Sequence, residues 1–223
     1  MEFEKFKSQI SGYVDAGKKI FATSSFQSHS MPLLHFISRL EDEVPVVFID
    51  TGYHFPETIE FRDQVAQQFN LQIINVRSSV PRIHQRTSGG YLYFTSDTDR
   101  CCYLNKIQPM EPILSRYDIW INGVRADQNQ SRGTMKVEQP APFGCTRFHP
   151  MLNWTQGMIE KYCLDHSLPK HPLEAKGYFS VGCEPCTVLA TDKNNRDGRW
   201  QGQEKTECGL HTILAQSKKA ADE

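Results

Sequence analysis

Seven cysteines are the feature of this 223-residue sequence with the clearest chemical potential. Two of them, Cys101 and Cys102, are adjacent, and two more, Cys183 and Cys186, form a C-x-x-C motif far downstream. Four thiolates suit a 4Fe–4S cluster or a zinc ion. Zinc sites favour two spaced pairs that wrap one ion, whereas adjacent thiolates can bind different irons of a cluster. A C-x-x-C redox pair and plain buried thiols are the alternatives.

Another cysteine, Cys208, stands alone in a polar stretch that reads Glu207-Cys208-Gly209-Leu210-His211. A free thiol at such a position is a liability unless it takes part in a reaction. A histidine and basic residues nearby favour the thiolate form, which is the nucleophile. An incidental cysteine is the alternative. Cys145 and Cys163 lie beside strand and helix patterns, and we predict that both pack in the core.

Cationic side chains lie where an anionic ligand would need them. Lys106 follows the adjacent cysteines by one helical turn, a position that offsets negative charge or binds an anion. Arg125 directly follows a predicted strand, and arginine binds phosphate or sulfate through two parallel hydrogen bonds. Arg196 and Arg199 lie between the C-x-x-C motif and the isolated cysteine, and Arg132 completes the set. A solvated lysine without a ligand is the alternative for Lys106.

The elements that would position these residues alternate between strands and helices. Strand patterns cover 18–23, 44–49, 71–76, 118–122 and, as a further candidate, 148–152, and helix patterns cover 31–40, 57–69 and 154–166. The run at 44–49 is continuously apolar, as in a strand that is covered on both faces. This alternation predicts an α/β fold with a doubly wound, mostly parallel sheet. We expect one domain over 1–189 and a mobile C-terminal tail over 190–223.

The loop after the first predicted strand, residues 24–30, is small and polar. In open parallel sheets, ligands bind beyond the carboxyl ends of the strands, and this loop lies there. Serine hydroxyls and the N–H groups of the following helix suit a phosphate or sulfate, although Ser28 or Ser30 could simply cap that helix. Asp50 and Thr51 end the second strand at the same edge. They would contact an adenine or a ribose, or begin a turn.

Composition excludes several classes of protein. Hydrophobic residues make up 39% and charged residues 23% of the chain, which indicates a globular protein. The net charge of −1 leaves no basic excess for nonspecific nucleic-acid binding. No apolar run approaches the roughly 18 residues that span a membrane, and no signal-peptide pattern is present. We therefore expect a cytoplasmic protein, in which cysteines serve as metal ligands or catalysts more often than as disulfides.

Together these motifs resemble the assimilatory adenylyl-sulfate reductases, the cluster-containing branch of the phosphoadenylyl-sulfate reductase family. The resemblance extends from about Phe21 to His211. It rests on these segments: Ser24-Ser25-Phe26, Phe48-Ile49-Asp50-Thr51, His54-Phe55-Pro56-Glu57-Thr58, Cys101-Cys102 with Lys106, Gly123-Val124-Arg125, Gly182-Cys183-Glu184-Pro185-Cys186, Gly198-Arg199-Trp200 and Glu207-Cys208-Gly209-Leu210-His211. The combination of the double cysteine, the C-x-x-C motif and the last segment is highly specific.

The resemblance implies an adenine-nucleotide alpha-hydrolase-like fold and adenosine 5′-phosphosulfate as substrate. It implies that Cys208 is the nucleophile, which attacks the sulfate sulfur, expels AMP and becomes an S-sulfocysteine. Thioredoxin, or a glutaredoxin-like reductant, would then release sulfite, and a homo-oligomer is possible. The implied ligands of a 4Fe–4S cluster are Cys101, Cys102, Cys183 and Cys186. The predicted substrate-binding residues are Ser24, Ser25, Phe26, Ser28, Asp50, Thr51, Lys106, Arg125, Arg196, Arg199 and His211.

Three alternatives remain at this stage. The first loop reads Ser24-Ser25-Phe26-Gln27, which looks more like the branch that acts on 3′-phosphoadenosine 5′-phosphosulfate, so that substrate, or both, stays open. A tRNA thiolase-like adenylating enzyme would share the fold, but its Ser-Gly-Gly-x-Asp-Ser type of loop is missing from residues 24–30. A noncatalytic metal-binding module, in which Cys208 has no role, is the third.

Overall fold

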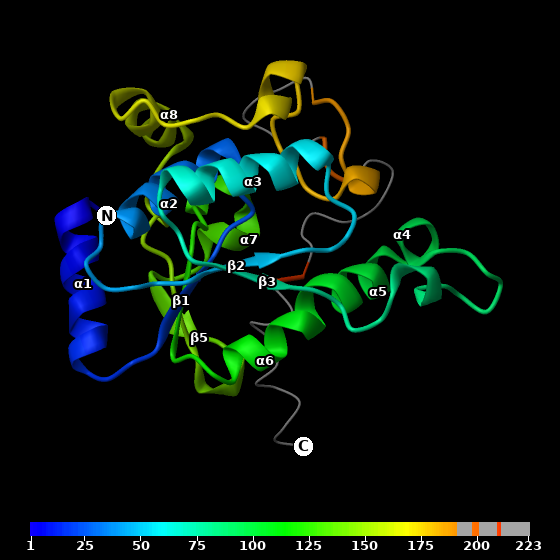
Figure 1. The fold of residues 1–223 in the computed structure, drawn as a ribbon, viewed down its shortest axis with the longest axis horizontal. Helices are drawn as coiled ribbons and strands as arrows, with labels where there is room; N and C mark the ends of the chain where they lie inside the picture. Colours follow the sequence, from blue (N-terminus) through cyan, green and yellow to red (C-terminus); the bar gives the residue numbers. More distant parts are fainter. Residues whose placement is uncertain (191–197, 201–208, 211–223) are drawn as a thin grey trace.

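A mostly parallel sheet forms the centre of the molecule in the computed structural model, which describes residues 1–190, 198–200 and 209–210 (Figure 1). In this described part the sheet has six strands in the order β3-β2-β1-β4-β6-β5. The strands are β1 (Ile20–Thr23), β2 (Val46–Ile49), β3 (Ile73–Val76), β4 (Ile119–Asn122), β5 (Glu138–Pro140) and β6 (Thr146–Phe148). Neighbouring strands are parallel except for the β5–β6 pair. The predicted α/β fold is thereby confirmed.

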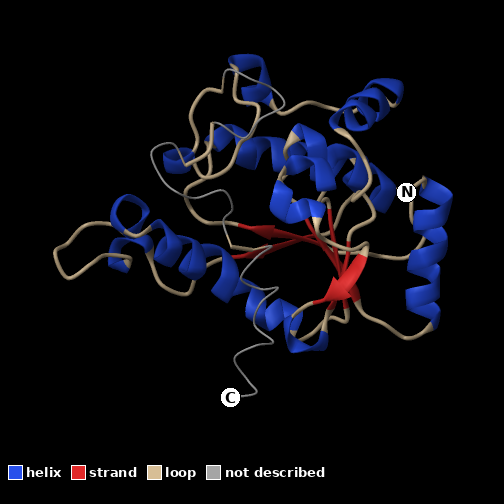
Figure 2. Ribbon diagram, turned by 180° about the vertical axis from the view of Figure 1, so that it is seen from behind, coloured by secondary structure: helices blue, strands red, loops and turns tan. Residues whose placement is uncertain are grey.

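Helices cover both faces of this sheet (Figure 2). The α-helices are α1 (Phe3–Asp15), α2 (Met31–Ser38), α3 (Pro56–Gln68), α4 (Tyr93–Ser96), α5 (Thr98–Cys102), α6 (Glu111–Leu114), α7 (Gln130–Gly133) and α8 (Gln156–Asp165). A π-helical turn, Tyr103–Ile107, continues α5. Short 3₁₀ segments are Ser28–Ser30, Arg82–His84, Gln108–Met110, Ala126–Gln128, Pro142–Gly144, Pro172–Lys176 and Glu184–Cys186. No described helix is long and apolar enough to cross a membrane.

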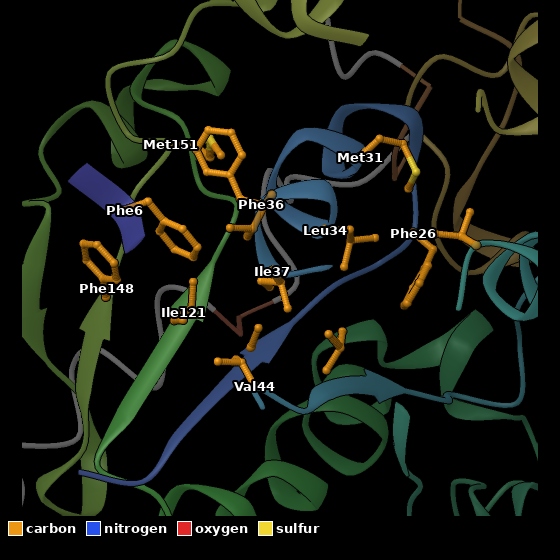
Figure 3. Close-up of a cluster of buried hydrophobic side chains, with 14 of the residues drawn as sticks. Phe6, Phe26, Met31, Leu34, Phe36, Ile37, Val44, Ile121, Phe148 and Met151 are labelled. Atoms are coloured by element: carbon orange, nitrogen blue, oxygen red, sulfur yellow. The ribbon is translucent and has the colours of Figure 1, made fainter. Parts of the chain in front are cut away.

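Alternate residues of the central strands enter two separate cores. In β4, Ile119 and Ile121 pack with α1, α2, α3 and α8, whereas Trp120 between them packs with the segment that follows α5. Figure 3 shows the first of these cores, in which Phe6 of α1 stacks on Phe148 of β6 with ring centroids 6.2 Å apart. A strand that is buried on both faces must be apolar throughout, which explains the continuous apolar runs in the sequence.

The predicted elements agree with the structure except at the last strand. The candidate strand at 148–152 is wrong, because β6 spans Thr146–Phe148 and ends where that candidate begins. Pro150 has no N–H to donate to a sheet, and the chain turns there with a bond from Leu152 N to His149 O of 3.1 Å. The sequence patterns also missed β5 and the short helices α4 to α7. The predicted tail at 190–223 lies largely outside the described residues, so the domain boundary stays a prediction.

Candidate active site

A cavity of about 540 Å³ lies beyond the carboxyl ends of β1, β2 and β4. The chain runs outward from β1 through β2 to β3 and then returns to place β4 on the other side of β1. Open parallel sheets bind ligands at such a reversal of strand order, because the connecting loops separate there. The volume is in the range of pockets that hold a nucleotide-sized molecule.

The loop after β1 turns its serines toward this cavity. Phe26 has φ of 54°, a left-handed conformation that non-glycine residues seldom adopt, and Ser24 Oγ accepts the Phe26 N–H at 3.0 Å. This turn buries the Phe26 ring against Phe48, with centroids 5.9 Å apart, while Ser24, Ser25 and Gln27 line the cavity. The neighbours of Phe26 in this turn therefore line the cavity, whereas the Phe26 side chain packs in the core.

Two other predicted residues also lie away from the cavity lining. Ser28 Oγ accepts the His171 N–H at 2.9 Å, so this hydroxyl joins two loops. The Asp50 carboxylate accepts from Arg77 at 2.6 Å and from the Gly52 N–H at 2.9 Å. Although burial opposes it, these two donors hold the pKa of Asp50 below its ordinary value. A substrate contact by Phe26, Ser28 or Asp50 stays a prediction that the cavity lining does not support.

Arg125 is held rigidly at the end of β4 and is only 5% exposed. Its Nε donates to Asp127 Oδ1 at 2.9 Å and its Nη2 donates to Gln156 Oε1 at 2.9 Å. Its Nη1 is buried without a hydrogen-bond partner among the described residues, and so is Nδ2 of Asn122. Buried donors of this kind normally have a partner. Because Asn122, Arg125 and Arg132 all line the cavity, the two open donors suit an anionic ligand.

Arg199 reaches the cavity from the segment at 198–200. Its Nε donates to Cys186 O at 3.0 Å, and its guanidinium lies 4.4 Å from the centroid of the Trp200 ring. The guanidinium passes directly over Gly182, where a Cβ atom would lie 2.2 Å from Arg199 Nη1. Only glycine leaves that space open, which explains the small residue before the C-x-x-C motif.

The four paired cysteines converge although the sequence separates them widely. Cys101, Cys102, Cys183 and Cys186 line a second, smaller cavity. Burial raises the pKa of Cys101 to about 12, and the neighbouring Cys102 and Cys183 add to that rise. Within the described ranges, no group of three or more histidine, cysteine or acidic side chains is arranged to hold a single metal ion. The four cysteines thus place soft ligands around one cavity.

Local structure explains how these cysteines meet. Asp97 caps α5 by accepting the Arg100 N–H at 2.8 Å, which presents Cys101 and Cys102 at the end of that helix. The C-x-x-C loop is tied to the loop after β2 by a bond from Glu184 N to Tyr53 O of 2.7 Å. Thr51 Oγ1 also lies 3.3 Å from Cys183 Sγ. The carboxyl end of β2 thus supports both cavities.

Lys106 lines both cavities, as do Thr51 and Cys183. The helical-turn spacing from the adjacent cysteines thus predicted its position well. Of the predicted substrate-binding residues, Ser24, Ser25, Thr51, Lys106, Arg125 and Arg199 line the larger cavity. Sequence analysis did not identify the neutral side chains that line the larger cavity, notably Gln27, Asn122, Gln128, Gln156 and Ser180. Their only signal was their position beside charged residues or strand ends.

Cys208, Arg196 and His211 lie outside the described residues, and their roles stay predictions. Leu210 is described: it lines the larger cavity, and its carbonyl accepts from Arg147 Nη2 at 3.3 Å. Arg147 is fully buried, and burial lowers its pKa to about 10. Cys145 and Cys163 are both buried in the hydrophobic cores, which confirms the prediction that they pack there.

Comparison with known proteins identifies related sequences over most of the chain. The model of the phosphoadenosine phosphosulfate reductase domain matches residues 19–189. An adenosine 5′-phosphosulfate reductase from Bacillus mycoides is 38% identical over 202 residues, which cover 89% of this chain and 86% of that protein. One from Rhodococcus erythropolis is 38% identical over 181 residues, which cover 80% and 73%.

Solved structures with a similar fold share much less sequence. A phosphoadenylyl-sulfate reductase from Candida auris has a TM-score of 0.67 at 22% identity and covers 82% of this chain and 89% of its own. An FMN adenylyltransferase from Candida glabrata has a TM-score of 0.58 at 16% identity and covers 85% and 68%. These similarities show the fold alone. It is the adenine-nucleotide alpha-hydrolase-like fold that the sequence resemblance implied.

Proposed function

The chain belongs to the phosphoadenosine phosphosulfate reductase family, and from this premise we propose that it reduces adenosine 5′-phosphosulfate to sulfite and AMP in sulfate assimilation. The observation that carries the proposal is the position of Lys106, which lines both the cationic cavity and the four-cysteine cavity. Related proteins named for this activity are similar over 80 to 89% of the chain. The solved reductase from Candida auris, which is named for phosphoadenylyl-sulfate, supports the fold but is only 22% identical.

The larger cavity binds the nucleotide with its phosphosulfate toward Lys106. Arg125 offers its open Nη1 to the anion, and Arg199 and Lys106 approach from other elements. Because Asp127 and Gln156 fix the remaining nitrogens of Arg125, little reorganisation is needed when charge develops on the leaving group. These donors stabilise AMP as it departs.

Cys208 is the nucleophile in this scheme. Its thiolate attacks the sulfate sulfur, the bond between that sulfur and the phosphate oxygen breaks, and AMP leaves with the bonding electrons. The enzyme then carries an S-sulfocysteine. A thiolate of thioredoxin, or of a glutaredoxin-like reductant, attacks the Cys208 sulfur, and sulfite departs as a mixed disulfide forms. Leu210, which follows Cys208 by two positions in the sequence, lines the larger cavity, which supports this role.

Cys101, Cys102, Cys183 and Cys186 hold a 4Fe–4S cluster in this proposal. Four soft ligands line one cavity, and the adjacent Cys101 and Cys102 suit separate irons of a cluster better than one tetrahedral zinc ion. Burial raises the pKa values of Cys101 and Cys186, so a bound metal would stabilise the thiolate forms of these two residues. When bound, the cluster supplies fixed charge near the sulfate and a rigid support for the segment that carries Lys106.

One experiment tests the covalent step. The anaerobic protein is mixed with adenosine 5′-phosphosulfate in the absence of any reductant, and AMP and the mass of the Cys208 peptide are measured. The proposal predicts one AMP for each chain, one SO₃ group on that peptide, and sulfite only after thioredoxin is added. Steady release of sulfite without an adduct on Cys208 would contradict it.

Reduction of 3′-phosphoadenosine 5′-phosphosulfate is the second candidate. Arg132 lies in the cavity lining in addition to Arg125 and Arg199, and the loop at 24–27 supplies further hydroxyl and amide groups. These donors offer a place for an additional phosphate. A kcat/KM for this substrate equal to or above that for adenosine 5′-phosphosulfate would favour this candidate.

A further inference from the structure

Two buried amides adjoin the first cysteine of the four-cysteine cavity. Gln85 is 1% exposed and Asn105 is 2% exposed. Gln85 Nε2 donates to Asn105 Oδ1 at 2.9 Å, and Asn105 Nδ2 donates to Gln85 Oε1 at 2.6 Å. Burying two neutral amides is unfavourable unless their hydrogen bonds are satisfied, so a pair in this position needs a reason.

The second donor of Asn105 points at Cys101. Asn105 Nδ2 lies 2.9 Å from the Cys101 carbonyl oxygen and 3.6 Å from Cys101 Sγ. An amide nitrogen carries two hydrogens: one goes to Gln85, and the other lies between the carbonyl and the sulfur. With the amide reversed, its oxygen would face two acceptors, so the hydrogen bonds fix this orientation.

Gln85 is itself held in place by the segment that precedes α4. Its Nε2 also donates to Val80 O at 2.9 Å, and its backbone carbonyl accepts the Tyr93 N–H at 2.9 Å. The Gln85 side chain therefore cannot turn without breaking its bond to Val80, and its backbone is held by Tyr93. It fixes the Asn105 amide from the side away from the cysteines.

Asn105 and Lys106 have the same spacing from the two adjacent cysteines. Lys106 follows Cys102 by four residues, and Asn105 follows Cys101 by the same interval, so each lies on the face of its cysteine. Both belong to the π-helical turn at Tyr103–Ile107, a type of turn that is frequent at functional sites. Lys106 lines both cavities, whereas Asn105 lines only the smaller one.

We propose that Asn105, oriented by Gln85, is a positioning residue that fixes the direction of the Cys101 side chain and donates a hydrogen bond to its sulfur as a cluster ligand. The proposal rests on the iron–sulfur cluster of the proposed function. A donor to a ligand sulfur stabilises its negative charge and sets the strength of its bond to iron.

The test compares anaerobically purified wild-type protein with Asn105→Ala, Asn105→Asp and Gln85→Ala. Iron and sulfide per chain, the rate of bleaching by a chelator and the Fe–S(Cys) stretching bands in resonance Raman spectra are measured. Bleaching of Asn105→Ala is expected to be about 10-fold faster, with shifted Fe–S(Cys) bands, because second-shell partners change metal affinity by about that factor. Gln85→Ala is expected to change the bleaching rate and the Fe–S(Cys) bands in the same direction as Asn105→Ala, but by a smaller amount.

Thr58→Val is the matched control, because it removes a buried hydrogen bond, to His171 Nε2 at 3.1 Å, whose partners lie outside the cysteine cavity lining. It lowers thermal stability and leaves the spectrum and the bleaching rate unchanged. If Asn105→Ala does not fold, Asn105→Asp tests the proposal instead. This variant keeps the shape of the side chain and the oxygen that accepts from Gln85 Nε2, but it removes the N–H donor to Cys101. Iron-loaded variants with wild-type bleaching and bands overturn this proposal alone, whereas wild-type protein that lacks iron overturns the cluster as well.

Discussion

Adding one methyl group at Gly182 is expected to damage substrate binding far more than folding. A Cβ atom there would lie 2.2, 2.3 and 2.4 Å from Nη1, Nη2 and Cζ of Arg199. Ordinary contacts to a Cβ atom begin near 3.4 Å. The guanidinium of Arg199 must therefore move by more than about 1 Å, and it is the flexible end of a side chain, so the backbone has no need to move.

The magnitude follows from what Arg199 loses when it moves. Its Nε bond to Cys186 O at 3.0 Å and its stacking on Trp200 both depend on the present position. When the guanidinium moves, it also loses its contact with the anionic substrate, and a hydrogen bond to a charged group contributes about 1.5–3 kcal/mol. Because about 1.4 kcal/mol corresponds to a factor of ten, Gly182→Ala should lower kcat/KM about 10- to 100-fold.

The assay is the initial rate of sulfite release from adenosine 5′-phosphosulfate with thioredoxin, combined with the thermal midpoint and the iron content. Gly12→Ala in α1 is the matched control, since its Cβ meets nothing within 4 Å. It should stabilise the helix by about 0.5–1 kcal/mol and leave kcat/KM unchanged. If Gly182→Ala keeps kcat/KM within twofold of wild type while retaining its iron, Arg199 does not act on substrate as described.

Three further predictions concern the anion site, the nucleophile and pH. Arg125→Lys keeps the charge but loses the fixed Nη1 donor, so kcat/KM for sulfite release should fall about tenfold or more; an unchanged value would refute the contact from Nη1 to the anion. Cys208→Ser should abolish sulfite release while keeping iron and nucleotide binding, whereas Cys163→Ala should keep activity. Burial lowers the pKa of His171 from 6.5 to about 4, so the folded state binds its proton less readily than the unfolded chain and stability falls with pH below about 6.5. Denaturant unfolding should show a loss of about 1.5 kcal/mol from this histidine between pH 6.5 and 5, and a His171→Gln variant with the same pH slope as wild type would contradict this.

Much of the fold could be predicted because strands of a doubly covered sheet must be apolar. The run at 44–49 and the helix at 57–69 correspond to β2 and α3 within a few residues. β5 could not be predicted in this way. It is an edge strand, Glu138–Pro140, whose residues are polar or lack an N–H, so no apolar periodicity marks it.

The parts of the site that could be predicted from the sequence are its charged side chains and its cysteines. Lys106 and Arg125 line the cavity because a helical interval and a strand end set their directions. Gln85 and Asn105 were missed, since a neutral amide shows its importance only when its partners are known. Ser28 and Asp50 lie at the expected edge, but they bond to His171 and Arg77, residues distant in sequence. Such pairings depend on tertiary structure.

The central claim is that this site reduces a sulfonucleotide and favours the form without a 3′-phosphate. The most direct measurement is sulfite release from adenosine 5′-phosphosulfate and from its 3′-phosphorylated counterpart, with thioredoxin, by one anaerobic preparation of known iron content. The account predicts an iron-containing protein with the higher kcat/KM for adenosine 5′-phosphosulfate. A preference for the 3′-phosphorylated substrate, or no sulfite from either, would contradict it.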